Sequence, residues 1–264
     1  TVYCTVYLPI VNRVTTMAFL QFLVLLTATF VAVTADPTGR VVGGFNAAPA
    51  QFPHQISLRR DHVHVCGGSI ISSNYILTAA HCVVEIGLKP FAAERFTILA
   101  GTHNRIAGGV VVPVKRVAVH QGYANSENDL ALLELAKHLT FSAKIQPIEL
   151  ASAEVPSGSE VIISGWGLIE NKGDTLPIIM QWNRVEALSK SECFRKILIS
   201  SDALICLNHP KGAGACNGDS GGPATYNGEL VGVAGFVVTG CGSSRPDGYA
   251  KVLYNLKWIH ENMI

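Results

Sequence analysis

Short apolar or alternating segments, separated by turn residues, recur through most of this chain and restrict the folds open to it. Turn signals such as Gly67-Gly68 and Asn227-Gly228 return about every 12 residues. This spacing favours a β-barrel or β-sandwich over β-α-β units. Strands are predicted within residues 55–59, 110–119, 130–133, 160–164 and 230–234. Only the C-terminal end, from Val252 to Met263, shows apolar residues at helical spacing.

The charge balance argues against some classes of partner. The chain has 264 residues, with 20 Lys and Arg and 19 Asp and Glu. Setting residues 1–40 aside removes Arg13, Arg40 and Asp36, which leaves 18 charges of each sign. A formally neutral chain has no excess of basic residues to attract nucleic acid or an anionic membrane. The length suits one large all-β unit or two small domains.

Residues 17–35 are predicted to be a secretory signal peptide. Met17 is followed by a mostly apolar run and by Val33-Thr34-Ala35, a small-residue pattern that predicts cleavage after Ala35. The competing interpretation is a transmembrane anchor, but the run is short, is interrupted by threonine and lacks a basic flank. Residues 1–16 contain no Met and are interpreted as upstream sequence. The alternative is that they are translated, in which case Arg13 would supply the positive charge that usually precedes the apolar run of a signal peptide. We therefore expect a secreted, extracellular protein.

Cysteine usage agrees with an oxidising compartment. Beyond Cys4 in the leader, the chain has an even number of cysteines: Cys66, Cys82, Cys193, Cys206, Cys216 and Cys241. Six cysteines allow 15 pairings, and the spacing does not choose among them. The sequence has neither a C-x-x-C nor an H-E-x-x-H motif, so a zinc site is not expected.

A short polar spacer, residues 36–40, ends in Arg40. A lone arginine in a segment with Pro and Gly is an accessible protease site. Cleavage after Arg40 would create a new α-amino group at Val41. The alternative is a loop that stays uncut.

One serine has an unusual setting, in the segment Gly218-Asp219-Ser220-Gly221-Gly222. The glycines leave room for a substrate backbone to approach the hydroxyl, which suits a nucleophile. The alternative is an ordinary Gly-rich turn.

Two further segments supply partners for this serine. His81 ends an apolar run beside Cys82, and Asp129 begins a predicted buried strand. A buried aspartate needs a partner, and a histidine that donates a ring N–H to it has its tautomer fixed. Taken alone, His81 has an ordinary interpretation as a core histidine and Asp129 as a cap or turn residue. Together with Ser220 they predict a catalytic triad.

These segments resemble the chymotrypsin/trypsin family of secreted serine endopeptidases. The motifs follow the family's order from Val41 to Ile264: Val41-Val42-Gly43-Gly44, Thr78-Ala79-Ala80-His81-Cys82, Asp129-Leu130-Ala131-Leu132-Leu133, Ser164-Gly165-Trp166-Gly167 and Gly218-Asp219-Ser220-Gly221-Gly222-Pro223. The resemblance implies an all-β peptidase domain, residues 41–264, with two six-stranded antiparallel Greek-key β-barrels, the active site between them and a C-terminal helix. It also implies disulfides between Cys66 and Cys82, Cys193 and Cys206, and Cys216 and Cys241.

The resemblance assigns roles to these residues. Ser220 attacks the scissile carbonyl, His81 takes its proton, and Asp129 orients His81. The backbone N–H groups of Gly218 and Ser220 form the oxyanion hole. The amine freed at Val41 pairs with Asp219, so the uncut chain is expected to be a zymogen.

Three residues are expected to shape the pocket for the side chain before the scissile bond. Gly214 stands where trypsin-like members have Asp, which argues against cleavage after Arg or Lys. Val237 stands where many members have Gly and favours small or medium apolar side chains, as in elastase-like members. Asp247 favours a different preference, because its carboxylate would accept a basic substrate group, as in collagenolytic relatives. The alternative for Asp247 is a solvated or internally paired acid.

Other departures from the family pattern concern the supporting residues. Gly235 stands where the family usually has a Ser beside the triad aspartate, and Phe236 where it usually has Trp. The segment Thr102-His103-Asn104 lacks the first acidic ligand of the family's calcium loop, so neither calcium nor another cofactor is expected. His62 and His64 would share one face of a strand, where two histidine rings could bind a metal. The preferred interpretation is a solvent-exposed strand face without a metal.

The expected function is a secreted zymogen of a digestive serine endopeptidase with a chymotrypsin- or elastase-like preference. Its expected partners are protein or peptide substrates, an activating protease that cuts after Arg40 and protein protease inhibitors, and the protein is expected to be a monomer. Two alternatives are a cascade or regulatory protease and a non-catalytic homologue. The complete set of His81, Asp129 and Ser220 argues against the last.

Overall fold

The structure is a computed structural model that describes residues 42–85, 89–124 and 127–263. The predicted upstream segment, signal peptide and activation peptide, together with Arg40 and Val41, lie outside the described residues.

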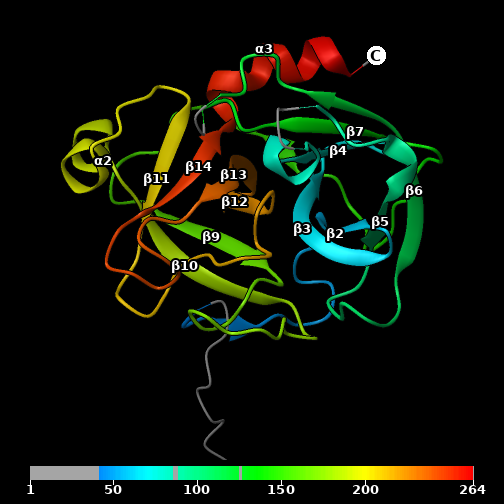
Figure 1. The fold of residues 1–264 in the computed structure, drawn as a ribbon, viewed down its shortest axis with the longest axis horizontal. Coiled ribbons are helices and arrows are strands. Elements are labelled where there is room, and N and C mark those ends of the chain that lie inside the picture. Colours follow the sequence, from blue (N-terminus) through cyan, green and yellow to red (C-terminus); the bar gives the residue numbers. More distant parts are fainter. Residues whose placement is uncertain (1–41, 86–88, 125–126, 264) are drawn as a thin grey trace, which may run out of the picture. The chain divides into compact units, whose positions relative to one another are not determined.

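Six antiparallel strands close into a first β-barrel in the spatial order β2-β3-β4-β7-β6-β5 (Figure 1). Its strands are β2 (Gln55–Arg60), β3 (Val63–Ile70), β4 (Tyr75–Thr78), β5 (Phe96–Ala100), β6 (Val110–Val119) and β7 (Ala131–Leu135). The barrel closes where β2 pairs with β5, with Ile56 opposite Ala100. The predicted alternating segment at 55–59 and the apolar run at 130–133 therefore become walls of one core.

A second barrel follows along the chain, with the closed order β9-β10-β11-β14-β13-β12. Its strands are β9 (Glu160–Gly165), β10 (Gln181–Ala187), β11 (Leu204–Asn208), β12 (Pro223–Tyr226), β13 (Glu229–Phe236) and β14 (Asp247–Lys251). Two short strands extend this sheet: β1 (Phe45–Asn46) pairs with β10, and β8 (Glu149–Leu150) lies parallel to β13. The predicted pair of six-stranded antiparallel barrels is confirmed.

Few helices accompany the barrels. The predicted C-terminal helix is α3 (Val252–Asn262), which buries Trp258 and Ile259. A second helix, α2 (Lys190–Ile197), was not predicted, and two 3₁₀ turns are η1 (Ala80–Cys82) and η2 (Ala93–Arg95). Among the described residues, no helix is long and apolar enough to cross a membrane.

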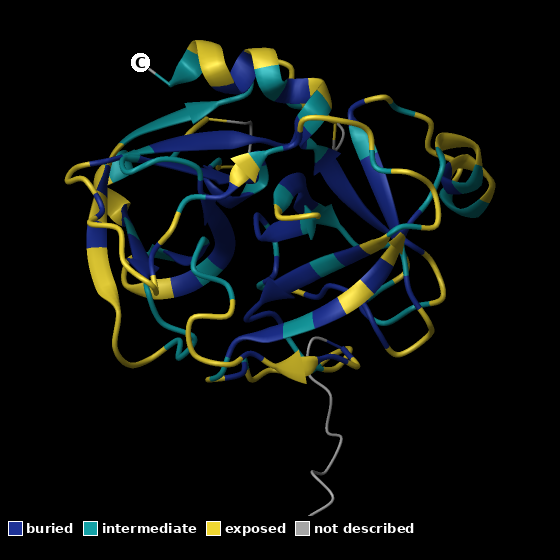
Figure 2. Ribbon diagram, turned by 180° about the vertical axis from the view of Figure 1, so that it is seen from behind, coloured by how far each residue is buried: buried dark blue, intermediate teal, exposed yellow. Residues whose placement is uncertain are grey.

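The strands of both barrels are mostly buried (Figure 2). Aliphatic side chains from both barrels make up most of one hydrophobic core cluster. The β4 strand is buried along its whole length, and β7 is buried at four of its five residues. Each fully buried Leu, Ile or Val contributes about 1.5–3 kcal/mol relative to its exposed state. This burial on rigid strands holds the loops at the strand ends in fixed positions.

Hydrogen bonds join the two barrels where those loops meet. The Gly67 N–H in β3 donates to the Ser220 carbonyl at 2.7 Å, and the Ser164 hydroxyl in β9 donates to Gln55 Oε1 at 2.7 Å. These hydrogen bonds hold together the two barrels that carry the predicted catalytic residues. His81 comes from the first barrel and Ser220 from the second.

Candidate active site

His81 and Asp129 form a close pair. His81 lies in η1, directly after β4, and Asp129 lies just before β7, the strand that pairs with β4. The Asp129 carboxylate accepts the His81 backbone N–H at 2.9 Å and lies 2.6 Å from Nδ1. Because a carboxylate only accepts hydrogen bonds, Nδ1 carries the proton and Nε2 is left as the basic nitrogen. Asp129 is 3% exposed, and its hydrogen bonds with His81 compensate the free-energy cost of burying the carboxylate.

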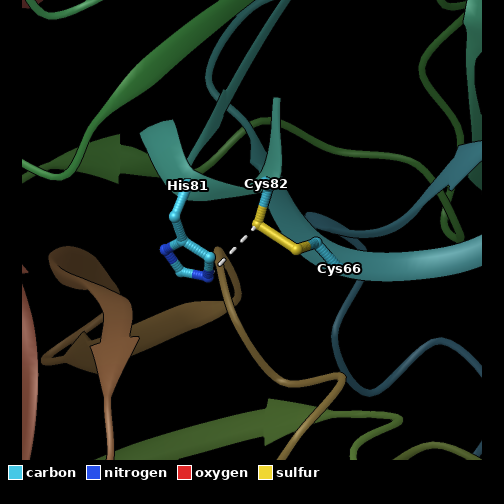
Figure 3. A group of neighbouring side chains, drawn as sticks. All are labelled: Cys66, His81 and Cys82. Carbon is cyan, nitrogen blue, oxygen red and sulfur yellow. Dashed lines mark hydrogen bonds between the residues drawn. A yellow bond between two sulfur atoms is a disulfide. The ribbon is translucent and has the colours of Figure 1, made fainter. Parts of the chain in front are cut away.

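A disulfide braces the histidine. Cys66 in β3 is bonded to Cys82, the residue after His81, and His81 Nε2 lies 3.8 Å from the Cys82 sulfur (Figure 3). Among the described residues, this is the one group whose metal-binding atoms gather within 4.8 Å. Both sulfurs are used in the disulfide, so neither is the thiolate that a metal would require. The cluster therefore serves to position His81.

The Ser220 loop is packed onto the first barrel. The Ser220 carbonyl accepts from Gly67, and Gly67 follows the braced Cys66. A Cβ on Gly221, which has a φ of 75°, would collide with the Thr78 hydroxyl and lie 2.8 Å from the Gly67 carbonyl. Glycine at 221 thus lets the serine approach the end of β4, next to His81.

Two backbone N–H groups in the Ser220 loop have no acceptor within the part of the chain that the structure describes. Among the described residues, neither the Gly218 nor the Ser220 N–H donates to another group, whereas the N–H groups of Asp219 and Gly221 do. Gly218 has a φ of 101°, a conformation that side-chain-bearing residues rarely adopt. Unpaired backbone donors are uncommon in folded proteins, and two in one tight loop suit a developing oxyanion.

No hydrogen bond joins Ser220 Oγ to His81 Nε2 within the described residues. Bonds between a nucleophile and its base are often long or misaligned until substrate is bound. The chain path still places Ser220 next to the disulfide that His81 contacts.

Asp219 is buried behind the serine. Its carboxylate accepts the Gly167 N–H at 2.7 Å and the Cys216 N–H at 3.0 Å. Burial, opposed by these two bonds and assisted by the charge of Asp247, raises the pKa of Asp219 to about 7. A buried carboxylate in this state would be stabilised by a cation. Its predicted partner, the Val41 amine, lies outside the described residues.

The Gly165-Trp166-Gly167 motif encloses this carboxylate. A Cβ on either glycine would collide with a carboxylate oxygen of Asp219. Trp166 is fully buried, and its Nε1 donates to the His103 carbonyl at 3.1 Å. The motif therefore forms the chamber in which Asp219 is held.

A cavity of about 90 Å³ opens beside Ser220. Its lining comes from the nucleophile loop and from the facing ends of β13 and β14: Ala215, Cys216, Asn217, Ser220, Ala234, Gly235, Phe236, Val237, Gly248 and Tyr249. Of the three residues predicted for the pocket, Val237 belongs to this lining. Gly214 and Asp247 do not, and each directly precedes a lining residue in the chain.

Asp247 is an internally paired acid. It is 2% exposed, its Oδ2 accepts the Ala215 N–H at 2.7 Å, and the same oxygen lies 3.2 Å from His209 Nε2. Sequence reasoning missed His209 altogether. The pairing of β11 with β14 places Leu207 opposite Asp247. His209 follows two positions after Leu207, and its side chain therefore comes close to the Asp247 carboxylate. A register of this kind is not readable from the local sequence.

The expectation of a wet face for His62 and His64 is wrong for His64. Asp61 and His62 form a turn with positive φ, and β3 begins only at Val63, so the two histidines do not share one strand. His64 is buried, lies 2.8 Å from the Ser57 hydroxyl through Nδ1 and 3.1 Å from the Gly218 carbonyl through Nε2. It supports the loop that carries Gly218 and Ser220, and burial lowers the pKa of His64 to about 4.

Arg105 is a second residue that sequence reasoning missed. Its guanidinium donates to the carbonyls of Leu176 and Pro177, each at 3.1 Å, and its backbone N–H donates to Ile178. These bonds tie the loop that follows β5 to the loop that precedes β10. A Leu176 methyl lies 3.1 Å from the position of a Cβ on Gly218, so the tie reaches the oxyanion loop.

The three predicted disulfides are present. Cys66 is bonded to Cys82, Cys193 to Cys206 and Cys216 to Cys241. The second anchors α2 to β11, and the third joins the nucleophile loop to the loop between β13 and β14.

Comparison with known proteins gives a consistent result. The family model described as Trypsin matches residues 41–259. "Serine protease SP24D" of Anopheles gambiae is 45% identical over 224 residues, which cover 85% of this chain and 81% of that protein. "Brachyurin" of Leptuca pugilator is 35% identical, with 83% of this chain and 96% of that protein covered. "Trypsin delta" of Drosophila melanogaster is 38% identical, with 85% and 88% covered.

A solved structure resembles the fold closely. Neuropsin, described as a serine protease expressed in the limbic system of mouse brain, superposes with a TM-score of 0.76 at 27% identity. The match covers 84% of this chain and 99% of that one.

Proposed function

The chain belongs to the trypsin family and is a serine endopeptidase, and we propose that Ser220, His81 and Asp129 carry its catalysis. The observation that carries this assignment is the double contact of His81 with the buried Asp129 carboxylate, through its backbone N–H and Nδ1. That contact fixes the tautomer in which Nε2 accepts a proton.

Acylation follows from this arrangement. Ser220 Oγ attacks the substrate carbonyl while its proton passes to His81 Nε2, and Asp129 stabilises the imidazolium that forms. The carbonyl oxygen becomes an oxyanion, and the free N–H groups of Gly218 and Ser220 donate to it. His81 then returns the proton to the leaving amine, the C–N bond breaks, and an acyl-serine remains.

Deacylation repeats the steps with water. His81 Nε2 takes a proton from a water molecule as its oxygen attacks the acyl carbon. The second oxyanion occupies the same two donors, and the proton passes to Ser220 Oγ as the ester bond breaks. The enzyme is thereby restored.

Cleavage after Arg40 is proposed to activate the enzyme. The α-amino group of Val41 would then pair with Asp219, whose carboxylate is buried and, within the described residues, accepts only backbone N–H groups. Val42, the next residue, supports this route because it is buried, bridges to Gly214 and packs against the Cys216–Cys241 disulfide. Before cleavage the chain is proposed to be a zymogen.

Small to medium aliphatic side chains are proposed to be preferred before the scissile bond. An enclosed apolar cavity of about 150 Å³ binds benzene, and this pocket is smaller, at about 90 Å³. Val237 and Phe236 narrow it, and Asp247 is paired behind its wall. Aromatic rings are therefore disfavoured relative to residues such as Leu.

The enzyme is proposed to act outside the cell as a digestive monomer. Its disulfides are stable in an oxidising compartment, and a pocket that selects mainly by size suits broad breakdown of protein. Its partners are then protein substrates, protein inhibitors that occupy the same cleft and the protease that cuts after Arg40.

The direct test is hydrolysis of a peptide panel before and after cleavage at Arg40. The cut chain is expected to hydrolyse peptides, the uncut chain to be much slower, and Ser220→Ala to lose about a millionfold in kcat. Ser152→Ala, a serine on the exposed surface of the second barrel, is the matched control and should keep full activity. Turnover by Ser220→Ala would show that the assignment is wrong.

A further inference from the structure

A buried pair of ionisable side chains lies behind the substrate pocket. The side chain of His209 is 0% exposed and that of Asp247 is 3% exposed, and His209 Nε2 lies 3.2 Å from Asp247 Oδ2. The proposed mechanism uses neither. Charged groups are rarely buried this deeply without a partner, so each depends on the other.

The surroundings of the His209 ring determine its charge. Nδ1 lies 3.0 Å from the Pro210 carbonyl oxygen, and Nε2 faces the Asp247 carboxylate. Both neighbours are acceptors, so a proton on Nδ1 is donated to the Pro210 carbonyl. Among the described residues Nε2 has no well-aligned hydrogen bond, so a proton there would meet Asp247 Oδ2 as an ion pair at 3.2 Å. A neutral ring would turn a nitrogen lone pair toward an oxygen. The pair is therefore an imidazolium and a carboxylate with no net charge.

This pair lies directly behind the pocket wall. Asp247 Oδ2 accepts the N–H of Ala215, a lining residue, and Asp247 precedes Gly248, another lining residue. A Cβ on Gly214 would lie 2.7 Å from Asp247 Oδ2 and would collide with His209 Nε2. The absence of a side chain at Gly214 thus leaves room for His209 and Asp247. The backbone of the lining residues Ala215 and Gly248 separates Asp247 from a substrate side chain in the pocket.

We propose that His209 is a specificity-determining residue, which neutralises Asp247 and so keeps the pocket selective for aliphatic over basic side chains. The inference rests on the proposed function of Ser220 and on the pocket assigned to it. Without the His209 charge, the Asp247 carboxylate would attract an Arg or Lys side chain through the thin wall. The substrate class gained would be peptides with a basic residue before the scissile bond.

Other ionisable groups surround the pair. Asp219 and Tyr249 are buried, and burial raises the pKa of each, with a smaller contribution from the charge of Asp247. Glu160, Arg184 and Glu186 border an open groove that Asn208, His209 and Pro210 also line. The groove's charged groups are in contact with solvent, which screens them, so Asp247 is the dominant partner of His209.

A pH dependence follows with a definite sign. Burial lowers the pKa of His209, but Asp247 and the Pro210 carbonyl raise it by more, so the net shift is upward from 6.5. Below that raised pKa the pair is neutral. As the pH rises through it, His209 loses its proton and Asp247 remains charged. The relative rate for basic substrates should therefore rise on the alkaline side.

The experiment compares two peptides that differ only in Arg or Leu before the scissile bond, using the cleaved enzyme. The ratio of their kcat/KM values cancels any pH effect on the catalytic steps that the two substrates share. We expect His209→Gln to raise the Arg/Leu ratio at least tenfold, and the double variant with Asp247→Asn to return it to the wild-type value. His260→Gln, a histidine on the exposed side of α3, is the matched control and should not change it.

The wild-type enzyme gives a second readout if His209→Gln does not fold. Its Arg/Leu ratio should rise with pH, and Asp247→Asn should flatten that rise. An unchanged ratio in folded His209→Gln, or a flat ratio in the wild type across the alkaline range, would overturn the inference while leaving the proposed function intact. Failure of the cleaved wild type to hydrolyse either peptide would instead overturn the proposed function.

Discussion

Val237 narrows the pocket at the scale of a single side chain. It is a branched residue in the lining of a cavity of about 90 Å³. Val237→Gly would remove three carbon atoms and bring the cavity toward the volume that holds an aromatic ring. We expect the Phe/Leu ratio of kcat/KM to rise by about tenfold, which is the low end of what a methylene-sized change in a pocket can produce. The measurement uses paired peptides that differ only at that residue, and an unchanged ratio would contradict the size argument.

Among the described residues, the Asp129 carboxylate has hydrogen bonds only with His81, and Gly235 has no side chain that could add another. A Cβ at this position would lie 3.6 Å from Asp129 Oδ2, within reach of a serine hydroxyl, and 3.1 Å from the Gly248 carbonyl. Gly235→Ser is therefore expected to donate to Asp129 and raise kcat/KM a few-fold, because the carboxylate is held more firmly. Gly235→Ala introduces the same crowding without the hydroxyl. An equal effect of both variants would show that the hydroxyl is not responsible.

Arg105 connects two loops at the scale of elements. Its two side-chain hydrogen bonds hold the loop around Leu176 against the oxyanion loop. We expect Arg105→Ala to lower the free energy of unfolding by about 1 kcal/mol and to lower kcat more than it raises KM. Thermal unfolding and steady-state kinetics check both effects. Arg184→Ala, which removes an exposed ion pair with Glu160, is the control and should change stability little. Equal effects of the two variants would contradict a positioning role for Arg105.

Elements differed in how far the sequence could predict them. The strands at 55–60, 110–119 and 160–165 follow alternating or apolar patterns, and the helix α3 follows its apolar spacing. The helix α2 was missed although Ser189 and Glu192 form a capping box, a local signal that was present in the sequence. It has only eight residues and a single buried side chain, so its hydrophobic pattern is weak.

The residues of the candidate site also differed in how far the sequence could predict them. His81, Asp129 and Ser220 lie in local motifs, so the sequence alone predicts them as a triad. The partnership of His209 with Asp247 depends on the register of β11 against β14, and the role of Arg105 depends on how two distant loops pack. The error over His64 has a local cause, because the turn at Asp61 and His62 delays the start of β3 until the residue after His62. Contacts that depend on tertiary pairing have no signature in one stretch of sequence.

At the scale of the whole molecule, Asp219 links stability to pH. Its pKa is raised from 3.8 to about 7 in the folded chain, so between these values the folded state holds a proton that the unfolded state has lost. Its contribution to the free energy of unfolding is therefore full below pH 3.8 and falls by about 4 kcal/mol as the pH rises to 7. His54 and His64 act in the opposite direction, because burial lowers the pKa of each to about 4.

A difference measurement isolates Asp219 from these histidines. Arg40→Gln keeps the chain uncut, and it is compared with the double variant that also carries Asp219→Asn. The free energy of unfolding of the first, minus that of the second, should fall by a few kcal/mol between pH 4 and pH 7. Denaturant unfolding with the disulfides intact supplies the values. A difference that does not change with pH would contradict the buried, proton-binding state of Asp219.

In the cleaved chain, Ser220 is proposed to be an activated nucleophile. The most direct measurement is the intact mass and peptide map of the protein after reaction with a fluorophosphonate, before and after cleavage at Arg40. We expect one adduct on Ser220 in the cleaved chain, its loss in His81→Ala and slow labelling of the uncut chain. A cleaved, folded chain that takes no adduct, or takes it on another residue, would contradict it.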